Sequence, residues 1–148
     1  MKMQEAFGAA QFVGRESKSG FAVLRGHFNL KKKGKATLRV AGLGFFTCYV
    51  NGKKISDDRF LPLFTDYEAR ENYPSGEVLS GHRLYVPEYD ISDLVVPGDN
   101  LIAISFGGGW YTITSDRFEA QCRWGDPKAI WRVTTEEGDF VSSDRDYK

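Results

Sequence analysis

The sequence predicts an all-β domain of antiparallel strands, and three observations support this fold class. Apolar residues recur in short runs, turn residues interrupt those runs about every eight to twelve positions, and helical spacing is almost absent. The chain has 148 residues, of which 41% are hydrophobic, so it suits one domain with its own core. We therefore expect residues 1–148 to form a single β-sandwich.

Period-two alternation identifies the individual strands. Leu38 and Val40 alternate with Thr37 and Arg39, which places one set of side chains toward a core. In chain order the expected strands are Phe21–Leu30, Ala36–Ala41, Phe45–Val50, Lys54–Ser56, Leu84–Tyr89, Asn100–Phe106, Phe118–Trp124, Ala129–Thr135 and Phe140–Ser143.

Turn signals connect these strands. Asn51-Gly52 is the strongest, because both residues tolerate the positive φ angles of a tight hairpin. A second hairpin is expected at Glu137-Gly138-Asp139, and one helical turn capped by Asp90 or Ser92 is expected before Pro97. The stretch 63–81 is long, polar and aromatic, which predicts a loop, and loops of that length are usually functional or mobile.

The charge balance excludes some partners. Twenty basic and twenty acidic residues cancel, so we expect no binding of nucleic acid and no membrane association. Lys31, Lys32, Lys33 and Lys35 predict a solvated turn between strands. The N-terminus lacks a long apolar run, so it resembles neither a signal peptide nor a membrane anchor, and the sequence does not assign a compartment.

Reaction chemistry is poorly supported by the available side chains. Cys48 and Cys122 have no metal-ligand spacing, which argues against zinc, and a disulfide between them is left open. His27 is expected on a sheet face and His82 in the long loop. No nucleophile motif of the GxSxG kind occurs, so we do not expect this segment to act as an enzyme alone.

The segment Phe106-Gly-Gly-Gly109-Trp110-Tyr111 is the most distinctive. A phosphate cradle would need a following helix, whereas β-prone residues follow here, so the glycines predict a bulge or a close backbone approach. Trp110 and Tyr111 have two interpretations, which are packing across the mouth of the sandwich and presentation as a stacking platform for a sugar.

A second cluster joins Ser56-Asp57-Asp58-Arg59 to the polar and aromatic residues 61–73. Its acids and its amide are hard oxygen ligands of the kind that calcium prefers, but no EF-hand spacing organises them. Solvated or salt-bridged loop charges are the favoured interpretation.

Three stretches carry a family resemblance, namely LRGHFNL, ATLRVAGLGFFTCYVNGKKISDDRFLPLFTDYEARENY and YDISDLVVPGDNLIAISFGGGWY. In this register, Leu24 to Tyr111 resembles the N-terminal β-sandwich module of bacterial α-L-rhamnosidases of glycoside hydrolase family 78. The resemblance implies a jelly-roll fold of the galactose-binding-like type, placed before an (α/α)6 catalytic barrel. The sequence is also similar to carbohydrate-binding module family 67, in which some modules bind L-rhamnose with calcium.

Two departures from the family pattern bear on sugar specificity. An extra PSGEVLSGHRLYVPE lies between Tyr73 and Tyr89, and Thr112-Ile113-Thr114 replaces the usual small residue and glycine.

The resulting hypothesis is a noncatalytic carbohydrate-recognition domain within a longer multidomain glycoside hydrolase. Rhamnose-containing glycans are the expected partners, calcium is a candidate cofactor, and no metal ligand or catalytic residue is assigned. The alternative is a structural module that packs against the catalytic barrel without binding sugar. The candidate ligand contacts are Trp110, Tyr111, Asp66, Tyr67 and Arg70.

Overall fold

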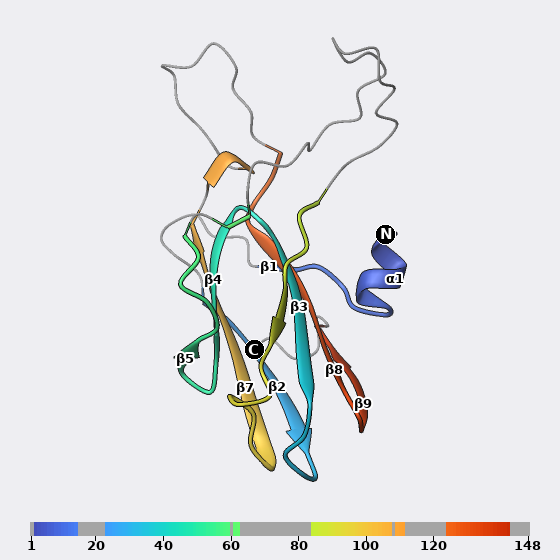
Figure 1. The fold of residues 1–148 in the computed structure, drawn as a ribbon. Helices are drawn as coiled ribbons and strands as arrows, with labels where there is room; N and C mark the ends of the chain where they lie inside the picture. Colours follow the sequence, from blue (N-terminus) through green and yellow to red (C-terminus); the bar gives the residue numbers. More distant parts are fainter. Residues whose placement is uncertain are drawn as a thin grey trace, which may run out of the picture.

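Two antiparallel sheets pack face to face in the computed structural model (Figure 1). The structure describes residues 2–14, 23–59, 61–62, 84–107, 109–111 and 124–142. The elements are α1 (Met3–Phe7), β1 (Val13–Gly14), β2 (Val23–Leu30), β3 (Ala36–Leu43), β4 (Phe45–Val50), β5 (Lys53–Lys54), β6 (Glu88–Asp90), β7 (Gly98–Gly107), the 3₁₀ turn η1 (Gly109–Tyr111), β8 (Lys128–Thr135) and β9 (Gly138–Val141).

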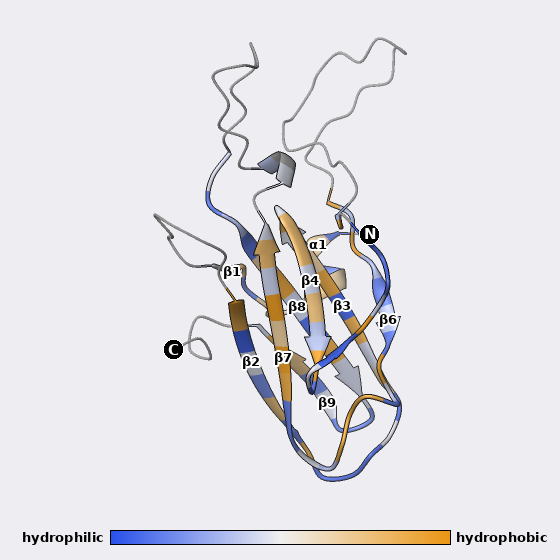
Figure 2. Cartoon of the chain, turned by 90° about the vertical axis from the view of Figure 1, so that its left-hand side faces the viewer, coloured by the Kyte–Doolittle hydropathy of each residue, from blue (hydrophilic) through white to orange (hydrophobic). Residues whose placement is uncertain are grey.

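The strand order confirms the predicted all-β antiparallel sandwich. One sheet has the order β1-β8-β3-β6, and β9 lies beyond β1 along the same edge of β8. The other sheet has the order β2-β7-β4-β5 and lies in front of β3 and β8 in Figure 2. We call them the first and the second sheet.

The core between the sheets follows from the period-two pattern. Burial alternates strictly along β2 and β7, so that every second side chain points inward. Trp131 of β8 is only 1% exposed and is the largest fully buried side chain. Cys48 is a free, buried thiol in this core, and burial raises the pKa of Cys48 to about 12, so it stays protonated at neutral pH.

A second apolar cluster, which the sequence did not predict, covers the outer face of the first sheet. Ala6 and Phe7 of α1 pack on Ala41 and Ile130. The sequence predicts almost no helix, and α1 is an exception. Its five residues are too few to show helical periodicity. The strand β1 was missed as well, since its pairing with β8 is long-range.

Ser142 fixes the N-terminal segment to the first sheet. The Trp131 N–H donates to Ser142 Oγ at 3.1 Å, and that hydroxyl donates to the Gln11 carbonyl at 2.8 Å. The Gln11 N–H donates in turn to the Ser142 carbonyl at 2.9 Å. The buried serine thus fills the gap between β1 and β9 and leaves no polar group of its own unpaired.

Short loops close one end of the sandwich, which we call the hairpin end (loops 31–35, 51–52, 91–97 and 136–137). The predicted turn at Asn51-Gly52 is confirmed, with φ angles of 50° and 78°. The hairpin between β8 and β9 is also confirmed.

A pair of amide side chains, Asn100 buried and Asn51 half-buried, supports the hairpin end from within. Asn100 is 1% exposed; its Oδ1 accepts from the Val96 N–H and from Asn51 Nδ2, both at 2.8 Å. Asn51 Oδ1 accepts from the Leu101 N–H at 2.9 Å. The hairpin asparagine therefore has a second function, because it links its own turn to the start of β7.

The turn expected before Pro97 is present, with Asp90 as its cap. The Val95 N–H donates to the Ile91 carbonyl at 3.2 Å, which makes one hydrogen-bonded turn that does not extend into a helix. Asp90 Oδ1 accepts from the Ser92 N–H at 2.9 Å and from Ser92 Oγ at 2.6 Å. These two bonds lower the pKa of Asp90.

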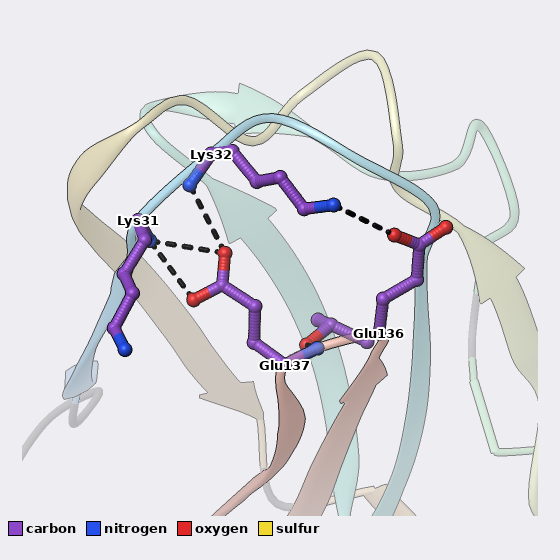
Figure 3. Close-up of polar contacts among 5 residues, drawn as sticks. Lys31, Lys32, Glu136 and Glu137 are labelled. Atoms are coloured by element: carbon purple, nitrogen blue, oxygen red, sulfur yellow. Dashed lines mark hydrogen bonds and ion pairs between the residues drawn. The ribbon is translucent and has the colours of Figure 1, made fainter.

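The lysine cluster forms a solvated turn, as predicted. The structure also shows the hydrogen bonds and the ion pair that hold this turn (Figure 3). The backbone N–H groups of Lys31 and Lys32 donate to the Glu137 carboxylate at 3.0 to 3.1 Å. Lys32 Nζ lies 3.2 Å from Glu136 Oε2. The loop between β2 and β3 is thus attached to the hairpin between β8 and β9.

Several strand boundaries differ from the prediction. The strand β6 is shorter than expected because residues 84–87 are irregular, and Pro87 has no N–H to donate to a ladder. The strand β5 is Lys53–Lys54 instead of Lys54–Ser56, because the two-residue turn places Lys53 opposite Val50. Most of the expected strand Phe118–Trp124 and the expected loop 63–81 lie outside the described residues, as do Cys122 and His82.

In the part of the chain that the structure describes, no helix is long and apolar enough to cross a membrane. His27 lies on the exposed face of β2, as expected for a sheet-face side chain.

Candidate functional site at the aromatic end

The end opposite the hairpins has a different construction, and we call it the aromatic end (Phe45, Gly109–Tyr111 and Trp124). The strand β7 ends here at Gly107, beside the start of β4 at Phe45. The 3₁₀ turn η1 lies just beyond this end of β7 (Figure 1).

Gly109 confirms the predicted close backbone approach. Its φ is 51°, and a Cβ at this position would lie 2.9 Å from both the backbone nitrogen and Cγ of Phe45. A Cβ at Gly107 would meet Phe45 only at an ordinary 3.8 Å, and Gly108 lies outside the described residues. The steric need for glycine is therefore concentrated at Gly109.

Tyr111 and Trp124 form a clasp at this end. The Trp124 N–H donates to the Tyr111 carbonyl at 3.2 Å, and the Tyr111 hydroxyl donates to the Trp124 carbonyl at 3.3 Å. Their ring centroids are 6.3 Å apart and their planes differ by 25°. Both residues are half-buried. The clasp joins the two ends of segment 112–123 and sets two aromatic rings almost parallel.

The start of the other long segment lies at the same end. The Phe46 N–H donates to the Leu61 carbonyl at 2.8 Å, and an isolated bridge joins the same two residues. Since Phe46 follows Phe45 in β4, residues 61–62 begin their long segment close to η1. The described residues that precede segment 63–83 and that flank segment 112–123 thus lie at the same end of the sandwich.

The candidate ligand residues have different outcomes. Tyr111 lies at the aromatic end, in contact with Trp124. The backbone of Trp110 belongs to η1, whereas its side chain lies outside what the structure describes. Asp66, Tyr67 and Arg70 also lie outside the described residues, so their role stays a prediction.

Trp124 is the residue that sequence reasoning missed as a site component. The sequence pattern predicts it only as the last residue of a strand, because nothing local connects it with Tyr111. The one available signal is composition, since Trp124-Gly125 repeats the glycine and tryptophan pairing of Gly109-Trp110.

The acidic cluster near residue 58 is partly engaged in the fold. The Tyr89 hydroxyl donates to Asp58 Oδ2 at 3.3 Å, across the open edge between the two sheets. Burial, followed by the Asp58 carboxylate, raises the pKa of Tyr89 to about 12. A shallow surface hollow lies here, and Lys54, Asp58 and Tyr89 are among the residues that line it.

The described side chains do not form a calcium site. Within the described ranges, no three His, Cys, Asp or Glu side chains converge as a metal site would require. Asp58 contributes one carboxylate, and its neighbour Tyr89 is a protonated phenol at neutral pH. We therefore assign no metal ligand.

The fold and this end together define a class, namely a β-sandwich domain with long segments and aromatic residues gathered at one end. The chain belongs to the family of α-L-rhamnosidase N-terminal domains, whose family model matches residues 31–148.

Curated relatives agree with the family assignment. An α-L-rhamnosidase of Streptomyces avermitilis is 32% identical over 114 residues, which cover 74% of this chain and 10% of the relative. An α-L-rhamnosidase of Alteromonas sp. is 34% identical over 91 residues, which cover 60% of this chain and 8% of the relative. The chain thus spans about a tenth of the length of these relatives.

Solved structures agree as well. The structure of the Streptomyces avermitilis α-L-rhamnosidase complexed with L-rhamnose matches with a TM-score of 0.64 and 26% identity, over 82% of this chain and 11% of that chain. An α-L-rhamnosidase structure from Dictyoglumus thermophilum has a TM-score of 0.70 and 24% identity, over 96% of this chain and 16% of that chain, and it supports the fold alone.

Proposed function

We propose that this domain is a noncatalytic carbohydrate-recognition module that assists substrate binding in a longer α-L-rhamnosidase. Residues 1–148 would form one domain of that enzyme, and the catalytic groups would lie elsewhere in the chain. The galactose-binding-like classification is part of the same proposal.

The observation that carries the proposal is the Tyr111–Trp124 clasp. Its two rings are nearly parallel, and two hydrogen bonds hold them in place before any ligand arrives. A sugar covers an aromatic ring with the C–H groups of one face, and preorganised rings lose little entropy on binding. L-Rhamnose adds a methyl group in place of one hydroxymethyl group, which increases its apolar surface.

The family supports the choice of ligand. The relative from Streptomyces avermitilis was solved in complex with L-rhamnose, which makes rhamnose and rhamnosyl oligosaccharides the first ligands to test. Asp66, Tyr67 and Arg70 would supply hydrogen bonds to sugar hydroxyls, on a segment whose start is attached beside Phe46.

Calorimetric titration of the 148-residue chain with L-rhamnose and a rhamnosyl disaccharide, with and without calcium, tests the proposal. We expect saturable binding that Tyr111→Ala weakens about fivefold to tenfold, the amount that one aromatic contact is worth. Tyr49→Ala is the matched control, because Tyr49 lies on the outer face of β4, away from η1. Absence of binding at millimolar sugar would reject the recognition function.

A second candidate is that the aromatic end packs against the catalytic part of the parent enzyme. The observation that favours it is that Tyr111 and Trp124 are half-buried and not fully exposed. Tryptophan fluorescence of a Trp131→Phe variant, which removes the buried core indole, distinguishes the two. A blue shift and protection from quencher on adding the catalytic part would favour packing, whereas a response to sugar alone would favour recognition.

A further inference from the structure

The strand β2 presents a long open edge. It runs over Val23–Leu30 and pairs with β7 along its whole length on one side. On its other side, no strand among the described elements pairs with it, and Figure 2 shows it at the margin of its sheet. The N–H and C=O groups that alternate away from β7 therefore lack a ladder partner among these elements.

The other sheet margins differ from β2 in length. The strand β5 at the opposite margin of the second sheet has two residues, both lysines, and β6 at the margin of the first sheet has three. Short and charged edge strands discourage the pairing of a further strand, and β2 has eight residues. At the remaining margin of the first sheet, β1 has two residues and β9 has four, so β2 is the longest margin strand among the described elements.

The outward side chains of this edge favour an acidic partner. Arg25 and His27 point outward on β2, and their neighbours in register on β7 are the apolar Ala103 and Leu101. Within the described residues, Arg25 has no acidic partner.

Arg39 on the first sheet shows the alternative arrangement. Glu88 lies opposite Arg39 on β6, and the two side chains pair at 2.6 Å. Among the residues that the structure describes, the arginine of β2 thus has no acid of the kind that pairs with Arg39.

The inner face of the edge is apolar. Leu24 and Phe28 point into the core and are only 7% and 4% exposed. Phe28 contacts the ring of Phe140 on β9, with centroids 5.3 Å apart, and Phe140 is half-buried at the same margin. Inward side chains of an added strand would continue this apolar layer.

We propose that the open edge of β2 binds an extended polypeptide segment that adds to the second sheet as one more strand. The segment alternates acidic residues, which face Arg25 and His27, with apolar residues, which face Leu24 and Phe28. Backbone hydrogen bonds supply the affinity, and the outward charges select the acidic partner.

A second copy of this chain is a poorer occupant. Antiparallel pairing must match outward with outward side chains, so it centres on Gly26 or on His27. The first register sets Arg25 opposite His27 of the second copy, and the other sets His27 opposite its own equivalent. Both registers place basic side chains together and supply no acid.

The experiment uses the 148-residue chain and two capped peptides of about ten residues, one alternating Glu with Val and the other alternating Lys with Val. Amide hydrogen exchange and calorimetry report binding. We expect the Glu peptide to protect β2 amides that exchange freely in the unbound chain, and to bind at least about fivefold more tightly than the Lys peptide.

Charge reversal supplies the control. Arg25→Glu should invert the preference between the two peptides, whereas Lys54→Glu on β5 should leave it unchanged. Binding without charge preference, protection of amides outside β2, or no binding of either peptide would overturn the proposal. A dimer of the unbound chain with protected β2 amides would assign the edge to a second copy and would overturn it as well.

Discussion

The two ends of the sandwich close the same strands by different means. At the hairpin end the loops are short, and polar groups are paired inside them, as in the Asn51 and Asn100 network. At the aromatic end two long segments begin, and the fastening is a clasp of rings and backbone bonds around Tyr111 and Trp124. The hairpin end therefore stabilises the fold, while the aromatic end, where the longer segments start, is the place of the proposed recognition function.

The largest effect should come from the hairpin end. Asn100→Ala removes an amide with four hydrogen bonds from a site that is 1% exposed, and it leaves the Val96 N–H and the Asn51 amide without that partner. We expect a loss of about 3 kcal/mol in the free energy of unfolding and a fall of about 6 to 12 °C in Tm.

Calorimetric unfolding measures this prediction, with Asn29→Ala as the control. Asn29 bonds Asp99 on an exposed face, so its loss should cost well under half as much. Equal losses for the two variants would contradict the stabilising role of the buried Asn100.

Two glycines allow a direct comparison of the ends. Gly52 and Gly109 both have positive φ, but a Cβ at Gly52 meets nothing within 4 Å, whereas one at Gly109 strikes the Phe45 backbone at 2.9 Å. We expect Gly52→Ala to cost about 1 kcal/mol, from backbone strain alone, and Gly109→Ala to cost about 2 to 3 kcal/mol. Urea unfolding measures both.

The same pair of variants also separates stability from recognition. Gly109→Ala should displace η1 and weaken sugar binding, while Gly52→Ala should leave the affinity unchanged. A loss of affinity in both variants would mean that the two ends are coupled through the sheets.

The strands and tight turns could be predicted from sequence because their signals are local. The strand β4 was expected over Phe45–Val50 and is found there, since six alternating residues suffice to define it. Asn51-Gly52 sets its hairpin through the φ angles of two neighbouring residues. At the site, the close approach of Gly109 was also predicted, because a glycine at a strand end has few other uses.

The missed features all depend on contacts between distant residues. Packing of Phe7 on Ile130, the link from Gln11 to Ser142 and the pairing of Tyr111 with Trp124 join parts of the chain that no local pattern connects. The second role of Asn51 was missed for the same reason, because its partner Asn100 belongs to another strand. Most strands could therefore be predicted from local pattern, whereas the long-range contacts at both ends of the sandwich are visible only in the structure.

A smaller effect should follow at the clasp itself. Tyr111→Phe keeps the ring opposite Trp124 and removes the hydroxyl, whose bond to the Trp124 carbonyl is long at 3.3 Å. We expect a loss of about 0.5 to 1 kcal/mol in stability and an unchanged sugar affinity, in contrast to Tyr111→Ala. A loss of binding in Tyr111→Phe would mean that the hydroxyl contacts the ligand directly.

The smallest effect at neutral pH should come from Glu137, whose side chain is exposed at the hairpin end. The N–H groups of Lys31 and Lys32 donate to its carboxylate and lower the pKa of Glu137 below its ordinary value (Figure 3). A lowered folded pKa means that the stabilisation is present above the unfolded pKa and is lost as the pH falls through the folded pKa. Tm measured from pH 7 down to pH 3 should therefore fall less steeply in Glu137→Gln than in the parent chain.

Glu136→Gln is the matched control for this variant, because Glu136 lies next to Glu137 in the same hairpin. Its carboxylate pairs with the exposed ammonium group of Lys32 and not with backbone N–H groups in the described part of the chain. Its acid profile should follow that of the parent chain, in which Asp90 and Asp139 also carry lowered pKa values. If Glu137→Gln and Glu136→Gln had the same profile, the two backbone bonds would contribute nothing beyond surface charge. The polar stabilisation of the hairpin end would then come from the Asn51 and Asn100 pair.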